Sequence, residues 1–133
     1  MKILRDNGIP TVVWLSPILP FINDTEKNIK GLLNYCKKAN VYGIICFGMG
    51  PYSTDGNREY FYKKLDNHFL KLKEKYISKY GNSYGINSQN NEKLMNLFHE
   101  ECEKNNIVHN NKEIFNFLRE VPEKDVQKNL FDF

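Results

Sequence analysis

The segment that decides the fold is Ile9–Asp24, which reads IPTVVWLSPILPFIND. Residues 11–15 (TVVWL) are rich in β-branched side chains and apolar on both faces, a pattern typical of a strand covered on both sides in a parallel sheet. Pro17 and Pro20 follow closely, and proline has no N–H to donate to a ladder. The segment therefore predicts a buried strand that the two prolines end at Ser16.

A helix and a second strand follow this segment. Asp24 or Thr25 is a suitable N-cap, and Glu26 lies favourably in the first turn. One face of the predicted helix is apolar and consists of Ile29, Leu32, Leu33 and Cys36. Residues 42–47 (YGIICF) then form a second apolar strand that ends in GMGP. The two strands and the helix between them form a β-α-β unit with parallel strands. Helical turns capped by Gly8 are expected before it, at residues 1–7.

The second half of the chain is predicted to be mainly helical. Apolar residues form a helical stripe over 57–79, namely Phe61, Leu65, Phe69, Leu72 and Tyr76, with lysines opposite. A polar loop over 81–91 precedes a helix marked by Leu94, Leu97, Phe98 and Cys102 and a short one marked by Ile114, Phe117, Leu118 and Val121. We expect a single domain or fragment, in which 1–56 is a βαβ barrel end and 57–133 is helical with a flexible tail from about 122.

Two adjacent strands that are apolar on both faces do not make a stable sheet, because a sheet this small leaves edges and faces uncovered. The remaining strands then come either from a second copy of the chain or from a missing N-terminal portion. The predicted fold class is α/β, a partial (β/α) barrel fragment that holds two parallel strands.

Composition sets wide limits on function. The 133 residues are 41% hydrophobic and 26% charged, and the net charge of +3 comes from 19 basic and 16 acidic side chains. This balance is too even to argue nucleic-acid binding from charge alone. The three cysteines are widely spaced, which favours reduced thiols in a cytoplasmic protein and neither a disulfide framework nor a metal site. No apolar run has the length that a membrane span needs.

In parallel α/β folds, ligands bind at the carboxyl ends of the strands. Here those ends are SPILPFIND, with the polar turn Asn23-Asp24, and CFGMGPY, where Gly48 and Gly50 let a flat ring or sugar approach the backbone. A structural interpretation competes with this one: the two prolines only end a strand, and the two glycines only form a tight turn.

Four blocks resemble one known family: IPTVVWLSPILPFIND, NVYGIICFGMG, NREYFYKKLD and KYGNSY. Their order and spacing are similar to the C-terminal part of radical S-adenosylmethionine proteins of the spore photoproduct lyase-like group, often named DNA repair photolyases. The resemblance implies a partial (β/α)6 barrel in which these two strands are the fifth and sixth. It also implies S-adenosylmethionine and a [4Fe–4S] cluster as cofactors of the full-length protein.

The same resemblance implies a set of cofactor-binding positions. Ser16 and Pro17 match positions that line the nucleotide cleft, and Asn23 and Asp24 match the turn that follows. The segment that borders the adenine is matched by Phe47, Gly48, Met49 and Gly50.

The chain departs from the family in its cysteines. A cluster needs three cysteines, usually as CxxxCxxC, whereas Cys36, Cys46 and Cys102 lie far apart in the sequence. We expect this chain alone to hold no cluster and to be inactive, with no catalytic or metal-binding residue of its own. In the whole protein the reaction would be radical chemistry on a nucleic-acid lesion, so nucleic acid is a candidate partner.

The tail offers a second candidate partner. Gln127, Leu130 and Phe131 fit QxxLF, similar to the peptide by which DNA-repair proteins dock on the sliding clamp. Alternatively, the tail folds back on its own core. The rival function is therefore a non-enzymatic helical module that forms homo-oligomers and binds a protein partner through this tail.

Overall fold

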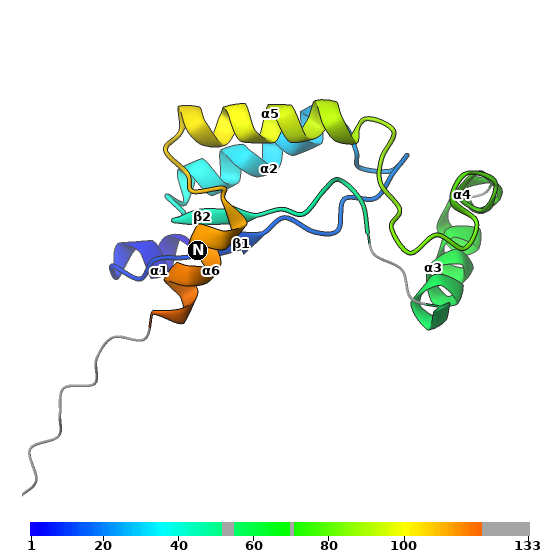
Figure 1. Ribbon diagram of the computed structural model, residues 1–133, viewed down its shortest axis with the longest axis horizontal. Coiled ribbons are helices and arrows are strands. Elements are labelled where there is room, and N and C mark those ends of the chain that lie inside the picture. Colours follow the sequence, from blue (N-terminus) through cyan, green and yellow to red (C-terminus); the bar gives the residue numbers. More distant parts are fainter. Residues whose placement is uncertain (52–54, 70, 121–133) are drawn as a thin grey trace, which may run out of the picture.

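The computed structural model describes residues 1–51, 55–69 and 71–120. Six helices and two strands lie in these ranges (Figure 1). Their bounds, in chain order, are α1 (Lys2–Asp6), β1 (Val12–Trp14), α2 (Glu26–Lys38), β2 (Gly43–Ile45), α3 (Asp55–His68), α4 (Leu72–Tyr80), α5 (Asn91–Lys104) and α6 (Asn111–Arg119). The fold is thus helix-rich with two parallel strands, paired from Val12↔Gly43 to Trp14↔Ile45. None of the described helices has the length and apolar character needed to cross a membrane.

Helices α2 and α5 lie side by side over one face of the sheet (Figure 1). The predicted apolar face of α2 supplies Ile29, Leu33 and Cys36 to the main core, and α5 supplies Leu94, Phe98 and Cys102. Thr25, one of the two predicted caps, accepts a hydrogen bond from the Asn28 N–H and begins α2. The predicted β-α-β unit with parallel strands is confirmed.

The outer edge of β2 is occupied by the segment that follows α5. Ile44 N–H donates to the Val108 carbonyl (2.9 Å), and Val108 N–H donates to the Tyr42 carbonyl (3.1 Å). Gly43 and Val108 form a parallel bridge, and a Cβ on Gly43 would lie 2.9 Å from that same carbonyl. After β2 the chain thus passes through α3, α4 and α5 and returns to the sheet as an extended segment parallel to β2. The opposite edge of the sheet belongs to β1, which pairs only with β2 among the described residues.

The sequence predicted that strand β1 is covered on both faces, and this prediction is wrong. Trp14 is 56% exposed and Val12 and Val13 are half-buried, whereas every residue of β2 is buried. The difference arises because α2 and α5 cover one face, while α6 lies along β2 and leaves β1 open. The apolar pattern of β1 does not indicate whether a second layer covers the strand, so its exposure could not be predicted from the sequence.

The stripe over 57–79 is two helices rather than one. Helix α3 ends at His68 and α4 begins at Leu72, with Lys71 at φ +72° between them. Fifteen residues of straight helix would separate Phe61 from Tyr76 by about 22 Å, yet their ring centroids are 5.2 Å apart. The break thus folds the apolar stripe into a second, smaller core with Leu65, Tyr76 and Ile86 at its centre.

Candidate functional site

The carboxyl ends of β1 and β2 lie at one edge of the sheet, since the strands are parallel. The last rung is the bond from Leu15 N–H to the Ile45 carbonyl (2.9 Å). Beyond it the chains diverge and leave a pocket of about 360 Å³. The pocket is lined by Trp14, Ser16, Pro17, Phe47, Gly48, Gly50 and Pro51. Five of the eight predicted cofactor-binding residues therefore lie around one hollow.

Three predicted residues lie apart from this hollow. Met49 is fully buried in the main core. Asn23 accepts a hydrogen bond from Leu19 N–H, and Asp24 accepts one from the hydroxyl of the buried Ser88. The two polar side chains hold the turn after β1 in shape, although Asn23 also borders a neighbouring pocket of about 330 Å³ with Ser16 and Pro17.

The two glycines differ in their surroundings. A Cβ on Gly50 would lie 2.0 Å from the carbonyl oxygen of Ile86, so the missing side chain is needed for the chain's own packing. Gly48, at φ +146°, faces the amide oxygens of Asn87 and Asn91 at 3.5 and 3.4 Å from an ideal Cβ. Gly48 is thus half-buried against these two side chains and also lines the pocket.

Asparagines shape this edge, and the sequence patterns gave no sign of them. Asn91 accepts a hydrogen bond from Met49 N–H (2.7 Å). Asn111 accepts from Cys46 N–H (3.3 Å) and donates to the Cys46 carbonyl (2.9 Å), so its amide replaces a neighbouring strand at the end of β2. Each of the two asparagines is the first residue of a helix. Because the chain is rich in asparagine, the sequence does not single out these two.

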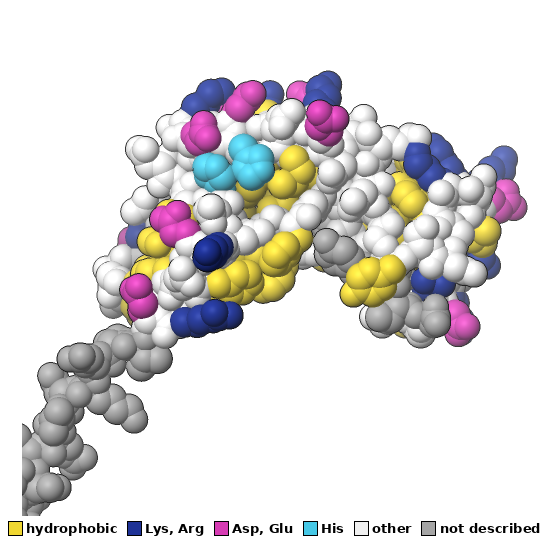
Figure 2. Space-filling model, viewed as in Figure 1, with side chains coloured by type: hydrophobic (Ala, Val, Ile, Leu, Met, Phe, Trp, Pro, Cys, Tyr) yellow, Lys and Arg dark blue, Asp and Glu magenta, His cyan; other side chains and the backbone are white. Residues whose placement is uncertain are grey.

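The rings of Trp14 and Phe47 line the pocket, and the ring of Phe115 lies beside them. The centroid of Trp14 lies 5.8 Å from Phe47 and 6.2 Å from Phe115 of α6. Phe47 is 52% exposed, and apolar side chains gather on the face that carries α6 (Figure 2). Large aromatic side chains left open beside a hollow can stack on a flat ligand or pack against further protein.

The three cysteines converge in the main core despite their spacing. Cys36, Cys46 and Cys102 are all free and buried, as predicted. Burial raises the pKa of each thiol, and that of Cys102 reaches about 12. Uncharged thiols are poor metal ligands, and the described residues contain no group of His, Cys, Asp or Glu suited to a metal ion.

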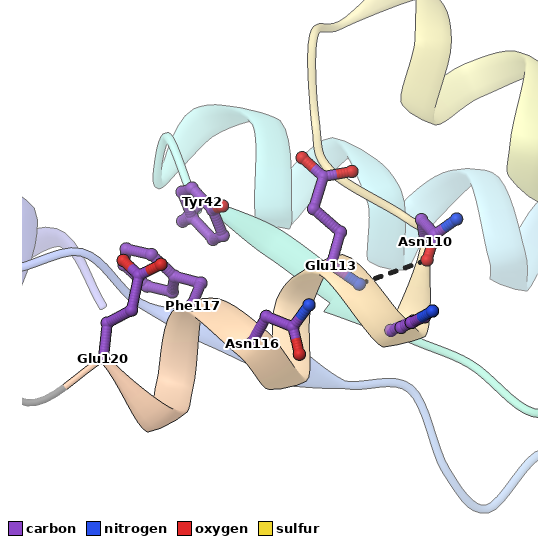
Figure 3. Close-up of a pocket in the computed structure, with 7 residues that line it drawn as sticks. Tyr42, Asn110, Glu113, Asn116, Phe117 and Glu120 are labelled. Atoms are coloured by element: carbon purple, nitrogen blue, oxygen red, sulfur yellow. Dashed lines mark hydrogen bonds between the residues drawn. The ribbon is translucent and has the colours of Figure 1, made fainter.

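A second hollow of about 360 Å³ lies beside α6, at the amino end of β2. Its floor is the stacked pair Tyr42–Phe117, whose centroids are 3.8 Å apart, and Asn110 caps α6 by accepting from Glu113 N–H (Figure 3). This is the sheet edge opposite to the strand ends. The predicted partner-binding residues Gln127, Leu130 and Phe131 lie outside the described residues.

Comparisons with protein-family models, curated proteins and solved structures found no match to the chain.

Proposed function

We propose that this chain forms the closing part of a radical S-adenosylmethionine barrel of the spore photoproduct lyase-like group, and that its strand ends form one side of the cofactor cleft. The observation that supports the proposal most is the unfinished sheet. The edge of β1 has no partner among the described residues, and Trp14 and Phe47 stand exposed beside that edge. Further strands of a barrel would pair with this free edge of β1 and enclose the pocket that these rings line.

The strand-end residues suit one side of a nucleoside site. The pocket offers the exposed Phe47 and Trp14 rings for stacking, and the Gly48 backbone lines the same pocket. Ser16 brings a hydroxyl to the same hollow. In this arrangement the chain binds and orients the cofactor.

The [4Fe–4S] cluster does not fit this chain. Its three thiols are buried among apolar side chains with raised pKa values, and Cys46 Sγ contacts Met95 Sδ at 3.7 Å. When bound elsewhere in the barrel, the cluster would supply the electron that cleaves S-adenosylmethionine to a 5′-deoxyadenosyl radical. A nucleic-acid lesion as the substrate of the whole protein stays a prediction.

The same unfinished edge supports a second candidate function. A second copy of the chain could pair with β1 and cover the aromatic rings, which would make the chain a non-enzymatic oligomerising module. A measurement of the molecular mass in solution separates the two proposals. A stable dimer favours the oligomerising module, and a monomer favours the closing part of a barrel.

Fluorescence of Trp14, the single tryptophan, tests the cofactor site. We expect S-adenosylmethionine to quench it in a saturable way, and the variant Phe47→Ala to weaken binding because it removes an exposed ring that lines the pocket. Tyr60→Ala, which removes an exposed ring from α3, is the matched control. No quenching at millimolar ligand, or equal quenching by free methionine, would contradict the proposal.

A further inference from the structure

The hollow beside α6, at the amino end of β2, has a volume of about 360 Å³ and is lined mainly by α6 and its two caps. Four of its lining residues repeat at the spacing of one helix face, namely Glu113, Asn116, Phe117 and Glu120. Glu120 is the C-cap, and its N–H donates to the Asn116 carbonyl (3.1 Å), so its Cα continues the helix. One face of α6 thus forms a wall of the hollow (Figure 3).

The middle of this wall is apolar and fixed in place. Phe117 stacks on Tyr42, with the ring centroids 3.8 Å apart and the ring planes at 20°. Tyr42 is held by its backbone, since its N–H donates to the Thr11 carbonyl (2.8 Å) and its carbonyl accepts from Val108 N–H (3.1 Å). The hollow therefore has a floor of two aromatic rings, which hydrocarbon or a cation can contact.

A carboxylate stands at each end of this floor. Glu113 and Glu120 are separated by about 10.5 Å along the helix axis, and Figure 3 shows their carboxylates apart with Tyr42 between them. Both residues are exposed, and neither forms a salt bridge with a described residue. Lys112 is the one cation among the described residues that line the hollow. The lining is therefore negative, although the whole chain has a net charge of +3.

The helix itself explains one of these carboxylates and not the other. Glu113 lies in the first turn of α6, where the helix dipole favours a negative charge. Glu120 lies at the opposite end, where the same dipole disfavours a negative charge and favours a cation. The stability of α6 thus gives no reason for a carboxylate at position 120, whereas a bound cation would compensate it.

We propose that this hollow binds a linear aliphatic polyamine. One ammonium group lies at Glu113, another lies at Glu120, and the methylene chain between them lies on the Tyr42–Phe117 rings. This order of charge, hydrocarbon and charge matches the order of groups along the wall. A single metal ion fits less well, because carboxylates about two helical turns apart do not converge on one centre. S-adenosylmethionine also fits less well, since a carboxylate lies next to its ammonium group and would be repelled.

The test is a titration of the full 133-residue chain with spermidine at low salt, followed by backbone amide NMR shifts. It needs neither a completed barrel nor S-adenosylmethionine, so its result is independent of the function proposed above. We expect saturable shifts at Tyr42 and Phe117. Glu113→Gln and Glu120→Gln should each weaken binding about 3-fold, and the double variant about 10-fold. The monoamine n-butylamine should bind at least about 3-fold more weakly than spermidine.

A second double variant, on α5, is the matched control. Glu92→Gln, Glu100→Gln removes the same charge from two exposed positions of one helix. It should keep nearly the wild-type affinity, because general attraction of a polyamine to a carboxylate surface is not the binding proposed here. Equal weakening by the two double variants would overturn the proposal. Shifts at Tyr42 and Phe117 that do not saturate, or equal binding of n-butylamine and spermidine, would overturn it as well.

Discussion

Replacing Gly50 by alanine tests how the strand end is joined to the second half of the chain. The new Cβ would lie 2.0 Å from the Ile86 carbonyl oxygen and 2.8 Å from Asn87 Cα. These are backbone atoms, so one segment must move by at least about 1 Å at an overpacking cost of about 1–3 kcal/mol. The move also strains two hydrogen bonds, Ile86 N–H to the Pro51 carbonyl and Ser88 N–H to the Met49 carbonyl.

Each of those bonds contributes about 0.5–1.5 kcal/mol, so we expect Gly50→Ala to lower the free energy of unfolding by about 2–6 kcal/mol. Urea unfolding followed by circular dichroism measures the change. Gly31→Ala is the control: Gly31 lies within α2 with open space around it, and alanine there should stabilise the chain by about 0.5–1 kcal/mol. A Gly50→Ala chain as stable as wild type would refute the packing described at this edge.

Three further predictions concern the core and the sheet. Asn111→Ala removes both hydrogen bonds to Cys46 and should cost about 1–3 kcal/mol in urea unfolding, whereas Asn116→Ala on the exposed face of α6 should change little; equal effects would contradict the role given to Asn111. Burial and the nearby His109 lower the pKa of His99. As the pH falls through about 6.5, His99 therefore takes up a proton in the unfolded chain before it does so in the folded chain, which favours unfolding. Between about pH 7 and pH 5 the urea unfolding midpoint should drop by less in His99→Gln than in wild type. Parallel profiles of the two proteins would contradict this. The three buried thiols should react with a thiol reagent only after denaturation, and fast reaction in the native chain would show that the core is open.

Local patterns in the sequence predicted the first half of the fold well. The β-branched run at 11–15, the cap at Thr25 and the apolar face of α2 each follow from short-range rules, and the structure has all three. Gly8, predicted as the helix-ending glycine, has φ +71°. These features depend on residues that are close in sequence, which is why reasoning from the sequence succeeds for them.

Contacts between distant residues were not predictable in the same way. The break at Lys71 depends on Phe61 meeting Tyr76, and the role of Asn111 depends on a strand 65 residues away. The exposure of Trp14 depends on which helices cover the sheet. Five predicted site residues do surround one hollow, because parallel strands bring their carboxyl ends together whatever lies between them.

The central claim is that the strand ends of β1 and β2 form one side of a nucleoside site, and mapping of backbone amide NMR shifts tests it most directly. On titration of the full chain with S-adenosylmethionine, we expect the largest shifts at Ser16, Phe47 and Gly48 and in the Trp14 indole. The hollow beside α6, with Tyr42 on its floor, should stay unperturbed. Shifts centred on that hollow, or none at the strand ends under saturating ligand, would contradict the account.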